Sequence, residues 1–573
     1  MRFKIKRKKR KNKFKRTDKL QIIPLGGIGE IGKNMFAVNC NEEIIVLDAG
    51  LAFPEDEMLG VDIVIPDISY LLENKEKIKA IFVSHGHEDH IGALPYILPK
   101  INAPIYGTKL TIGLLEAKLE EYGLDRSAEL HEIRAGEEIT IGSFDIRSFA
   151  TNHSIPDSVG FVLKTPVGNI VYTGDFKFDH TPVTGKGTDL HDLAKIGKEG
   201  VLVALVDSTN AERPGYTNSE SEVGEILKEI FLAAEGRVII ATFASNIFRI
   251  QQVVNAANFS GRRLAVDGRS MVNVSEIAQK LGYLHIPPRI LIDVDDVKNF
   301  SDDQVVVLTT GTQGEPMSAL ARLSSSTHRK LEIVPSDTVV IAANPIPGNE
   351  KLVSRTIDNL FRQGAKVIYE RESGVHVSGH GNQEELKLML SLLRPKYLIP
   401  VHGEYRHLIH HAELAKKMGM KKENILIVDN GTVMEFSANL GKIVSSVPAE
   451  GVFVDGLGVG DVGNIVLRDR RVLSKDGIFI VVITVDSKAN INSGPEVFSR
   501  GFVYVKESEE LLDEAREDVS KVLKNLAQRK VSDWATIKNS IRDSVSRFLW
   551  EKTGRRPMIL PIIMETAPEK VRQ

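Results

Sequence analysis

Short runs of β-branched and other apolar residues dominate the first third of the chain, and several of them stop at a polar side chain. From residue 19 onward such runs end at Asp48, His85, Asp175 and Asp207, and a later run, PKYLIPVHG, ends at His402. Runs of this kind, bounded by Gly, Pro, Asn and Asp, predict buried strands with loop residues at their ends. Functional groups of layered α/β proteins gather in loops at strand ends, so these positions are candidate site residues.

Between about Tyr216 and Ser373 the pattern changes to strands that alternate with amphipathic stretches. The predicted helices are Asn246–Asn258, Met271–Leu281 and Lys351–Gln363. Such alternation predicts a parallel, doubly wound unit. Strand-like segments of the first type resume at Val367 and continue to about Phe436. We therefore expect one domain that is interrupted by an inserted one.

The last segment combines the strand-like runs IFIVVITVD, GFVYV and PMILPIIME with amphipathic stretches over Glu509–Gln528 and Ser532–Lys552. This pattern predicts a small α+β domain. The expected organisation is a basic disordered arm (1–18), the first part of the interrupted domain (19–215), the insert (216–373), the second part of the interrupted domain (374–449), and a linker with the C-terminal domain (450–573).

Composition narrows the class of protein. The 573 residues are 42% hydrophobic and 26% charged, the usual mixture of a globular protein. The longest apolar run, Ile478–Val485, is too short to cross a bilayer. A single cysteine, Cys40, excludes an intramolecular disulfide and a cysteine-rich zinc cluster. We expect a reduced, cytoplasmic protein whose metal ligands, if it has any, are His, Asp and Glu.

The charge is distributed unevenly. Residues 1–16 carry 11 of the 74 Lys and Arg side chains and no acid, which leaves 63 basic against 76 acidic groups in the rest of the chain. The arm lacks the apolar stretch of a secretion signal. Two interpretations stay open: a solvated disordered arm, or an arm that holds an anionic polymer by releasing counterions.

Candidate chemistry is concentrated in one six-residue segment, where His85, His87, Asp89 and His90 follow a predicted strand. Four nitrogen or oxygen ligands on such a loop can face two adjacent metal ions. Neutral imidazole and carboxylate suit zinc or manganese when no thiolate is available. The alternative is a chance histidine-rich turn, but H-x-H-x-D-H is far more constrained than a lone pair of histidines.

With Asp48, His153 and Asp175 added, this pattern resembles the metallo-β-lactamase fold, an αββα sandwich. Asp48 is similar to the aspartate that orients the histidine loop without binding metal itself. The ligands that the resemblance implies for two divalent ions are His85, His87 and His153 for one, Asp89 and His90 for the other, and Asp175 as the bridge.

Three later motifs, together with the inserted unit, are similar to those of the β-CASP nucleases, which act on nucleic acids. They contain Asp207 (VDSTN), residues 376–380 (HVSGH) and His402 (PVHGE). In that group a histidine at the last position accompanies RNA substrates, and His402 would complete the second metal's ligands. Asp207 is implied as the general acid; its alternative is a loop cap.

The second of these motifs offers a hydroxyl, imidazoles and glycine-freed backbone N–H groups, which suit a phosphate. Its expected substrate-binding residues are His376, Val377, Ser378, Gly379 and His380. His380 is also implied as a contact to the scissile phosphate or a proton acceptor; a packed loop histidine is the alternative.

Over nearly the whole chain the sequence resembles the bacterial ribonuclease J family. The supporting stretches are residues 24–34 (PLGGIGEIGKN), 51–62 (LAFPEDEMLGVD), 242–252 (TFASNIFRIQQ), 309–320 (TTGTQGEPMSAL) and 343–350 (ANPIPGNE). The resemblance implies a ribonuclease with two divalent metal ions per chain, zinc first and manganese as the alternative. It also implies 5′-to-3′ exonuclease and endonuclease activity in mRNA decay and rRNA maturation. The implied partners are RNA with a 5′-monophosphate, further copies of the chain in a homodimer or homotetramer, and an RNA decay complex; no membrane is involved.

Three other functions compete with this interpretation. A small-ester hydrolase of the same fold would need neither the insert nor the HVSGH segment. A β-CASP DNA nuclease is disfavoured by His402. A catalytically weak RNA-binding scaffold belongs to another class, and the complete ligand set argues against it.

Two further groups of polar residues lie outside these motifs. A predicted helix begins with Ser245, Asn246 and Arg249. These residues are candidates for contact with an RNA backbone, and it is equally open that they make no such contact. His407, His410 and His411 follow His402 at helical spacing without a motif, so we expect them on the surface.

Overall fold

The computed structural model describes residues 18–55, 57–183, 187–313, 315, 317–345, 349–369, 373–437, 440–456, 458–485, 491–503, 509–529 and 531–565. The predicted basic arm therefore lies, except for its last residue, outside the described residues. The chain divides into two compact units, one formed by the chain up to Phe53 with Ile63–Val452, the other by Pro54–Asp62 with the chain from Phe453 onward.

The first unit is built on two sheets that face each other across a shared apolar core. The first sheet has eight strands in the order β21-β20-β1-β2-β3-β5-β6-β7, and the second has six in the order β19-β12-β11-β10-β9-β8. The strands of the first sheet are β1 (Leu20–Gly26), β2 (Met35–Cys40), β3 (Glu43–Leu47), β5 (Ile78–Phe82), β6 (Ile105–Thr108), β7 (Leu130–Ile133), β20 (Thr432–Phe436) and β21 (Gly441–Ser446). Those of the second are β8 (Glu138–Ile141), β9 (Phe144–Ala150), β10 (Val159–Lys164), β11 (Asn169–Tyr172), β12 (Val203–Asp207) and β19 (Tyr397–Val401).

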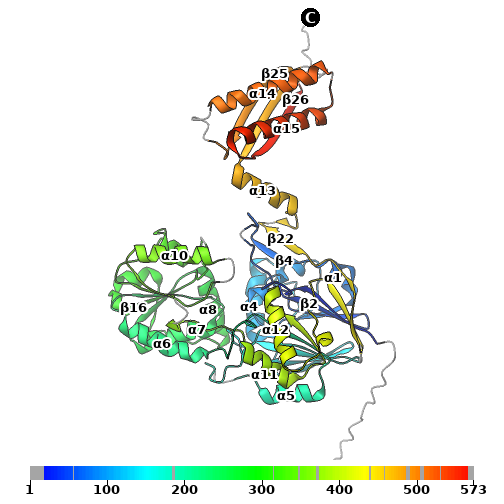
Figure 1. The fold of residues 1–573 in the computed structure, drawn as a ribbon. Helices are drawn as coiled ribbons and strands as arrows, with labels where there is room; N and C mark the ends of the chain where they lie inside the picture. Colours follow the sequence, from blue (N-terminus) through cyan, green and yellow to red (C-terminus); the bar gives the residue numbers. More distant parts are fainter. Residues whose placement is uncertain are drawn as a thin grey trace, which may run out of the picture. The chain divides into compact units, whose positions relative to one another are not determined.

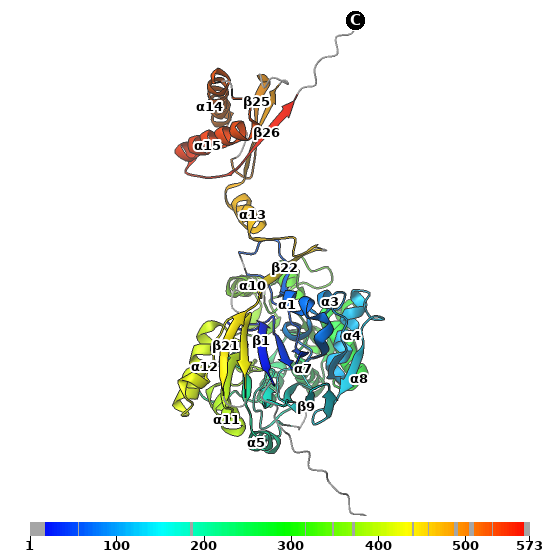
Figure 2. The ribbon, with the colours of Figure 1, turned by 90° about the vertical axis from the view of Figure 1, so that its right-hand side faces the viewer.

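Helices cover the outer faces of this sandwich. Those that carry or flank it are α1 (Ser69–Glu73), α2 (Glu88–Ile91), α3 (Leu94–Ile97), α4 (Lys109–Glu121), α5 (Leu190–Glu199), α11 (Gln383–Leu393) and α12 (Tyr405–Lys417). A short strand, β4 (Ile63–Pro66), precedes α1. Helices α5, α11 and α12 lie together over the second sheet, while α4 packs on β6 and β7 (Figures 1 and 2).

Strand β12 shows why the sequence presents unbroken apolar runs here. Val203 and Leu205 face the core between the sheets, whereas Ala204 and Val206 face the helix layer. Because successive side chains point to opposite faces and both faces are covered, every position must be apolar until the strand ends at Asp207.

The chain leaves the sandwich after β12 and, beyond the inserted unit, returns through α11 to β19. These two strands are parallel neighbours, with Asp207 opposite Val401. The excursion of almost 190 residues therefore ends beside the point where it began. This connection brings the end of β12 next to the residue that follows β19, His402.

The insert is a six-stranded parallel sheet in the order β15-β14-β16-β13-β17-β18 with helices on both faces (Figure 1). Helices α9 and α10 pack on one face, and α6, α7 and α8 lie on the other. The elements are α6 (Glu220–Ala233), β13 (Val238–Ala241), α7 (Ile247–Phe259), β14 (Arg263–Val266), α8 (Arg269–Leu281), β15 (Leu291–Ile292), β16 (Val305–Thr309), α9 (Ala319–Ser324), β17 (Thr338–Ile341), α10 (Glu350–Arg362) and β18 (Lys366–Ile368).

The second unit is a small α+β structure. A three-stranded sheet in the order β25-β24-β26 packs one face on two long helices, around a core that includes Phe479, Val519 and Val545. The elements are β22 (Gly451–Asp455), β23 (Gly458–Val459), α13 (Asn464–Asp476), β24 (Ile478–Val485), β25 (Ile491–Arg500), α14 (Glu509–Gln528), α15 (Trp534–Thr553) and β26 (Met558–Glu565).

The predicted architecture is confirmed: an αββα sandwich with an inserted parallel α/β unit and a C-terminal α+β unit. Helices read from periodicity agree with the structure within two residues at each end, as for α8 and α14. The domain limits given above stay a prediction. In the described part of the chain, every helix is too short or too polar to span a membrane.

Candidate metal centre

The expected metal ligands lie at strand ends on one edge of the sandwich. His87 directly precedes α2, and His90 lies within that helix. The other candidates and the strands that they end or follow are His85 (β5), His153 (β9), Asp175 (β11), Asp207 (β12) and His402 (β19). Side chains that are spread over more than 300 residues of sequence thus meet in one place.

Four of these side chains form a first group: His85, His87, His153 and Asp175. His87 Nδ1 lies 3.0 Å from His85 Nε2 and 3.1 Å from His153 Nε2. Asp175 Oδ2 is 3.7 Å from His85 Nε2 and 3.6 Å from His153 Nε2. Three imidazole nitrogens and a carboxylate oxygen therefore converge.

A second group shares the same aspartate: Asp89, His90, Asp175 and His402. His90 Nε2 lies 3.3 Å from Asp175 Oδ2, and His402 Nδ1 lies 2.8 Å from Asp175 Oδ1. His402 Nε2 is 3.2 Å from Asp89 Oδ2. Asp175 is the member common to both groups.

Buried hydrogen bonds orient these rings. Asp48 accepts from the backbone N–H and the hydroxyl of Ser84, from Tyr172 Oη, and lies 2.7 Å from His90 Nδ1. That contact leaves His90 Nε2 facing the cluster. Likewise His153 Nδ1 donates to the Gly379 carbonyl at 2.8 Å, which directs its Nε2 inward. Second-shell partners of this kind select the tautomer that a metal ligand needs.

Backbone conformation also reflects the demands of the site. Asp48 and His402 adopt left-handed conformations with φ of 58° and 51°, which non-glycine residues rarely take. The His402 N–H is held by the Gly27 carbonyl at 2.7 Å. Strain of this kind persists where surrounding contacts over-determine the backbone, and it is common at functional sites.

The electrostatics of the cluster favour a positive charge. Burial lowers the pKa of His402, but Asp175 and Asp89 outweigh burial and raise it to about 10. For His85, burial and the neighbouring imidazoles His90 and His87 hold the pKa well below its ordinary value, so the ring is neutral. The carboxylates therefore hold a proton on His402, and a divalent cation bound there would replace that proton, because an imidazole binds metal in its neutral form.

The donor set also fits a pair of metal ions. Asp175 Oδ1 and His402 Nε2 are buried and have no hydrogen-bond partner among the described residues, although each faces an oppositely charged group within 3.2 Å. Such close approach without a hydrogen bond is typical of ligands that share a cation. The clusters are therefore compatible with a dinuclear metal site.

Asp207 lies at the edge of this site and bonds to His380. Their Oδ2 and Nδ1 atoms are 2.8 Å apart. Burial raises the pKa of Asp207, but His380 outweighs this and holds it below the usual value. Thr209 also bonds to Asp207, through its N–H at 2.9 Å and its hydroxyl at 2.7 Å. Asp207 is thus a loop cap and also a partner of a site histidine, while its role as the general acid stays a prediction.

The HVSGH segment folds against the same edge. A Cβ on Gly379 would lie 2.6 Å from His153 Cε1, which explains the glycine. His376 has a pKa lowered to about 3, first by burial and then by nearby cations, with Arg249 the largest. Val377 is buried. Ser378 Oγ lies in a hydrogen-bond network described below.

One expectation from the sequence is wrong, and one question that the sequence left open is answered against Arg249. His407 and His411 are buried rather than on the surface, and only His410 is exposed. Arg249 is fully buried, where it bonds to Glu220 and to the Val375 carbonyl, so its guanidinium is not available to RNA. Asn246 is buried as well and caps helix α7.

Sequence reasoning also missed several supporting residues: Ser84, Tyr172, Thr209 and Asn210. Ser84 precedes the histidine motif, and two of the others follow Asp207 within VDSTN, so adjacency to a motif was the available signal. Tyr172 had none, because its contact with Asp48 joins residues 124 positions apart.

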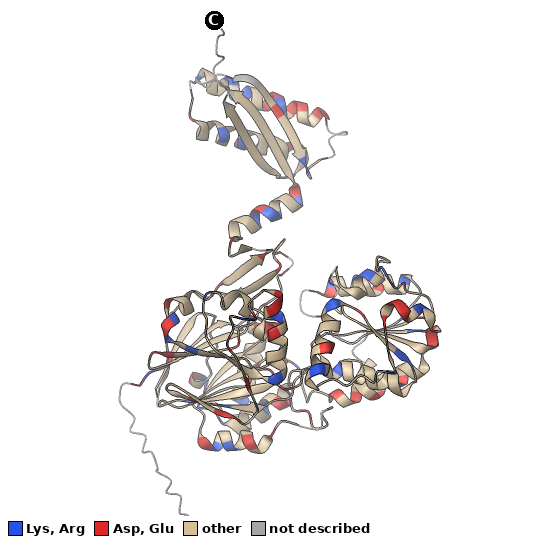
Figure 3. Ribbon diagram, turned by 180° about the vertical axis from the view of Figure 1, so that it is seen from behind, with Lys and Arg blue, Asp and Glu red and all other residues tan. Residues whose placement is uncertain are grey.

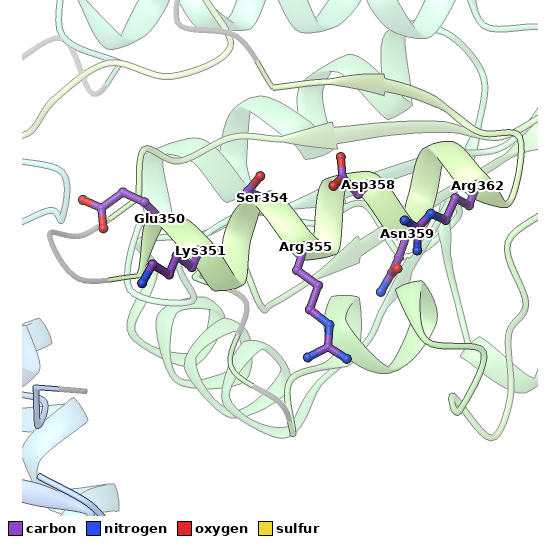
Figure 4. Close-up of a pocket in the computed structure, with 7 residues that line it drawn as sticks. All are labelled: Glu350, Lys351, Ser354, Arg355, Asp358, Asn359 and Arg362. Atoms are coloured by element: carbon purple, nitrogen blue, oxygen red, sulfur yellow. The ribbon is translucent and has the colours of Figure 1, made fainter. Parts of the chain in front are cut away.

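A recess of about 510 Å³ lies elsewhere, along the outer face of α10, and contains no metal-centre residue (Figure 4). Its lining mixes Lys351, Arg355 and Arg362 with Glu350 and Asp358. Both signs of charge are interspersed in the same way on other helices (Figure 3). We interpret this lining as the solvated side of an amphipathic helix.

Comparison with known sequences agrees with this architecture. The matching family models are those of the metallo-β-lactamase superfamily (residues 28–210), the ribonuclease J β-CASP domain (235–360), the Zn-dependent metallo-hydrolase RNA specificity domain (364–428) and the ribonuclease J C-terminal domain (465–566). Among solved structures, a protein of unknown function from Enterococcus faecalis matches with a TM-score of 0.52 and 14% identity, over 73% of this chain and all of that one. That likeness shows the fold alone.

Curated relatives match over nearly the whole chain. Ribonuclease J2 of Bacillus subtilis is 51% identical over 554 residues, which are 96% of this chain and 100% of that protein. Ribonuclease J 1 of Streptococcus pyogenes is 44% identical over 97% of this chain and 99% of its own length. Ribonuclease J 2 of Staphylococcus aureus is 44% identical over 96% and 99%. Since the sandwich, the insert, the convergent His and Asp groups and these relatives agree, the chain belongs to the ribonuclease J family of metal-dependent nucleases.

Proposed function

We propose that the protein is a dinuclear-metal ribonuclease that degrades and matures RNA from the 5′ end and also cleaves it internally. The observation that carries this proposal is the convergence of seven His and Asp side chains into two of the three overlapping groups that share Asp175; the third joins Asp175 and His402 to Asp207 and His380. Their proposed assignment is His85, His87 and His153 to one ion, Asp89, His90 and His402 to the other, with Asp175 between them. The description of the matching RNA specificity domain supports zinc, and the same ligand types also suit manganese.

Two divalent ions in such a site lower the pKa of a water molecule and offset charge on phosphoryl oxygens during in-line displacement. The chain's own contribution is to hold the ligands in orientation through Asp48, Ser84 and Tyr172. A pre-organised site avoids the cost of reorganising dipoles at the moment of reaction.

Proton transfer is assigned to Asp207 and His380 acting together. Their 2.8 Å contact holds one proton between imidazole and carboxylate. His380 would give the proton on its other nitrogen, Nε2, to the leaving 3′-oxygen, while Asp207 fixes the ring at Nδ1 and offsets its positive charge. This assignment keeps Asp207 essential while making His380 the group nearer to the substrate.

The 5′-end preference is assigned to residues 376–380. This segment suits a phosphate ligand, because it combines a hydroxyl, imidazoles and backbone N–H groups. A pocket sized for one phosphate would exclude a triphosphate by its bulk and charge. We therefore expect faster 5′-to-3′ degradation of monophosphorylated RNA.

The proposed setting is the cytoplasm, in mRNA decay and rRNA maturation, as a homodimer or homotetramer and in contact with an RNA decay complex. An uncovered apolar face on the sheet of the second unit supports self-association, since Phe498, Leu560 and Ile562 are 52%, 44% and 37% exposed there. Light scattering or sedimentation tests the oligomeric state.

The deciding experiment digests one RNA that carries either a 5′-monophosphate or a 5′-triphosphate, with labels at both ends and metal content measured on the same sample. Release of single nucleotides from the monophosphorylated end, at about two metal ions per chain, is the expected result. A purified protein that binds RNA and holds metal but cleaves neither substrate would instead be an RNA-binding scaffold.

A further inference from the structure

The hydroxyl oxygen of Ser378 accepts two hydrogen bonds from within the protein. Asn210 Nδ2 lies 2.8 Å from Ser378 Oγ, and the backbone N of His380 lies 3.1 Å from it. A serine hydroxyl has two acceptor positions and one proton to donate. With both acceptor positions filled, the only remaining capacity of this group is its proton.

The direction of both bonds is fixed by the chemistry of the partners. The backbone N–H of His380 can only donate. Asn210 could in principle present either its oxygen or its nitrogen, but the same side-chain atom also lies 2.9 Å from the His380 carbonyl oxygen. Because that carbonyl can only accept, the atom must be the amide nitrogen. Ser378 therefore cannot accept from the substrate.

We propose that Asn210 is a positioning residue for 5′-end recognition, because it obliges the Ser378 hydroxyl to donate its proton to a terminal phosphate. This inference rests on the proposed function. A phosphate monoester presents only acceptors at neutral pH, whereas a 5′-hydroxyl end can donate or accept. A hydroxyl restricted to donation thus favours the phosphorylated end.

The surroundings of the segment agree with an anionic ligand. Asn210 is buried, with only 3% of its surface exposed, while Ser378 is half-buried. Besides burial, Arg249, Arg213 and Lys177 lower the pKa of neighbouring His376, although Arg249 and Lys177 are also paired with Glu220 and Asp179. Thr217 donates to the His380 carbonyl at 2.8 Å, so that carbonyl keeps one donor when Asn210 is changed.

The test substitutes Asn210→Asp, which preserves size but replaces the donor with an acceptor. The carboxylate would take the Ser378 proton for itself and turn the hydroxyl away from the phosphate. The measurement is the affinity of the metal-depleted protein for a short 3′-labelled RNA with either a 5′-monophosphate or a 5′-hydroxyl, together with the exonucleolytic rate ratio of the holoenzyme on the same pair.

We expect the preference for the 5′-monophosphate to fall by roughly tenfold or more, the size of one hydrogen bond to a charged group. Ser378→Ala should lose a similar factor, and Asn210→Asp should add nothing in the Ser378→Ala background. Asn210→Ala, which frees the hydroxyl to rotate, should lose less. A matched control is Asn169→Asp, since Asn169 also donates to a carbonyl, that of Gly200, but on the exposed surface outside the site.

The outcomes separate the two proposals. If the unmutated protein does not prefer the 5′-monophosphate over the 5′-hydroxyl, the proposed 5′-end pocket fails. If it does, and Ser378→Ala loses the preference while Asn210→Asp and Asn210→Ala both retain it in full, the role of Asn210 is overturned. Should Asn210→Asp not fold, Asn210→Ala and its double variant with Ser378→Ala decide the question by the same comparison.

Discussion

Two histidine-rich segments of this protein, residues 85–90 and α12, place their imidazoles in different surroundings. In the first, the rings of His85 and His87 approach other imidazoles within about 3 Å and face a shared carboxylate. In the second, which forms α12, His407 Nδ1 accepts from the Glu404 N–H and His411 Nδ1 meets the Ser208 hydroxyl at 2.9 Å. His407 and His411 are therefore held by hydrogen bonds within the fold, and His407 Nδ1 must be unprotonated to accept its bond.

The difference teaches that burial and histidine content do not distinguish a metal ligand from a structural histidine. His85 and His411 are equally buried, and burial lowers the pKa of both. What separates them is the chemistry opposite the second ring nitrogen. His85 Nε2 faces two other candidate ligands, His87 and Asp175. The buried Nε2 of His411, in contrast, has no hydrogen-bond partner among the described residues.

The largest effect that this comparison predicts is for His85→Ala. Removing one ligand should abolish cleavage, with a loss on the order of several powers of ten, because nucleophile generation and charge stabilisation both depend on the site. Metal content should fall in the same preparation while circular dichroism stays unchanged. Near-normal RNA cleavage by the metal-depleted variant would refute the dinuclear mechanism.

The next effect concerns Asp207, which bonds to His380 at the edge of the candidate site, while its neighbour Ser208 meets His411 of α12. Asp207→Asn keeps the shape but removes the charge that holds the His380 proton. Cleavage should fall by roughly 10²–10⁴ with RNA binding retained. If only the melting temperature drops and the rate is unchanged, Asp207 is a loop cap alone.

Much of the architecture could be predicted from the sequence, because it depends on local patterns, whereas the candidate ligand set was implied by the family resemblance. Apolar runs that stop at a polar residue identified the ends of β11 and β12, and periodicity identified α8 and α14. The burial of Arg249 could not be predicted. Its partners lie 29 and 126 residues away, and nothing in TFASNIFR distinguishes a guanidinium that reaches a buried carboxylate from one that faces solvent.

The same limit explains the error on α12. Helical spacing of His407 and His411 indicates which residues share a face, but not whether that face meets the core. The face is covered because α12 packs over the second sheet next to β12, and Ser208 extends that strand by one residue. Tertiary packing, rather than any feature of the segment itself, decides the burial.

A smaller effect is expected for His411→Asn, which tests the structural side of the comparison. Burial lowers the pKa of His411 to about 4. The unfolded chain therefore binds more protons than the folded one between about pH 4 and 6.5, so the stability that depends on neutral His411 is lost as the pH falls through that window. Relative to the unmutated protein, the variant should lose roughly 3 kcal/mol less stability on acidification from pH 7 to pH 4.

Denaturant unfolding at both pH values measures this difference. Asparagine keeps an amide near the Ser208 hydroxyl, so the variant should fold and cleave RNA within about tenfold of the unmutated rate. Identical pH dependence in the two proteins would show that His411 titrates normally and that its burial has no electrostatic consequence.

The smallest effect is predicted for His410→Ala, the matched surface control on the same helix. The side chain is 52% exposed, and its Nε2 lies 3.4 Å from Glu212 Oε1. The other oxygen of that carboxylate, Oε2, pairs with Arg406. An exposed pair of this kind contributes about 0–1 kcal/mol, and Glu212 keeps its stronger partner. Both the melting temperature and the cleavage rate should therefore stay within experimental error of the unmutated protein. A tenfold loss of cleavage in His410→Ala would mean that α12 belongs to the reaction site, and the contrast between the two histidine segments would no longer hold.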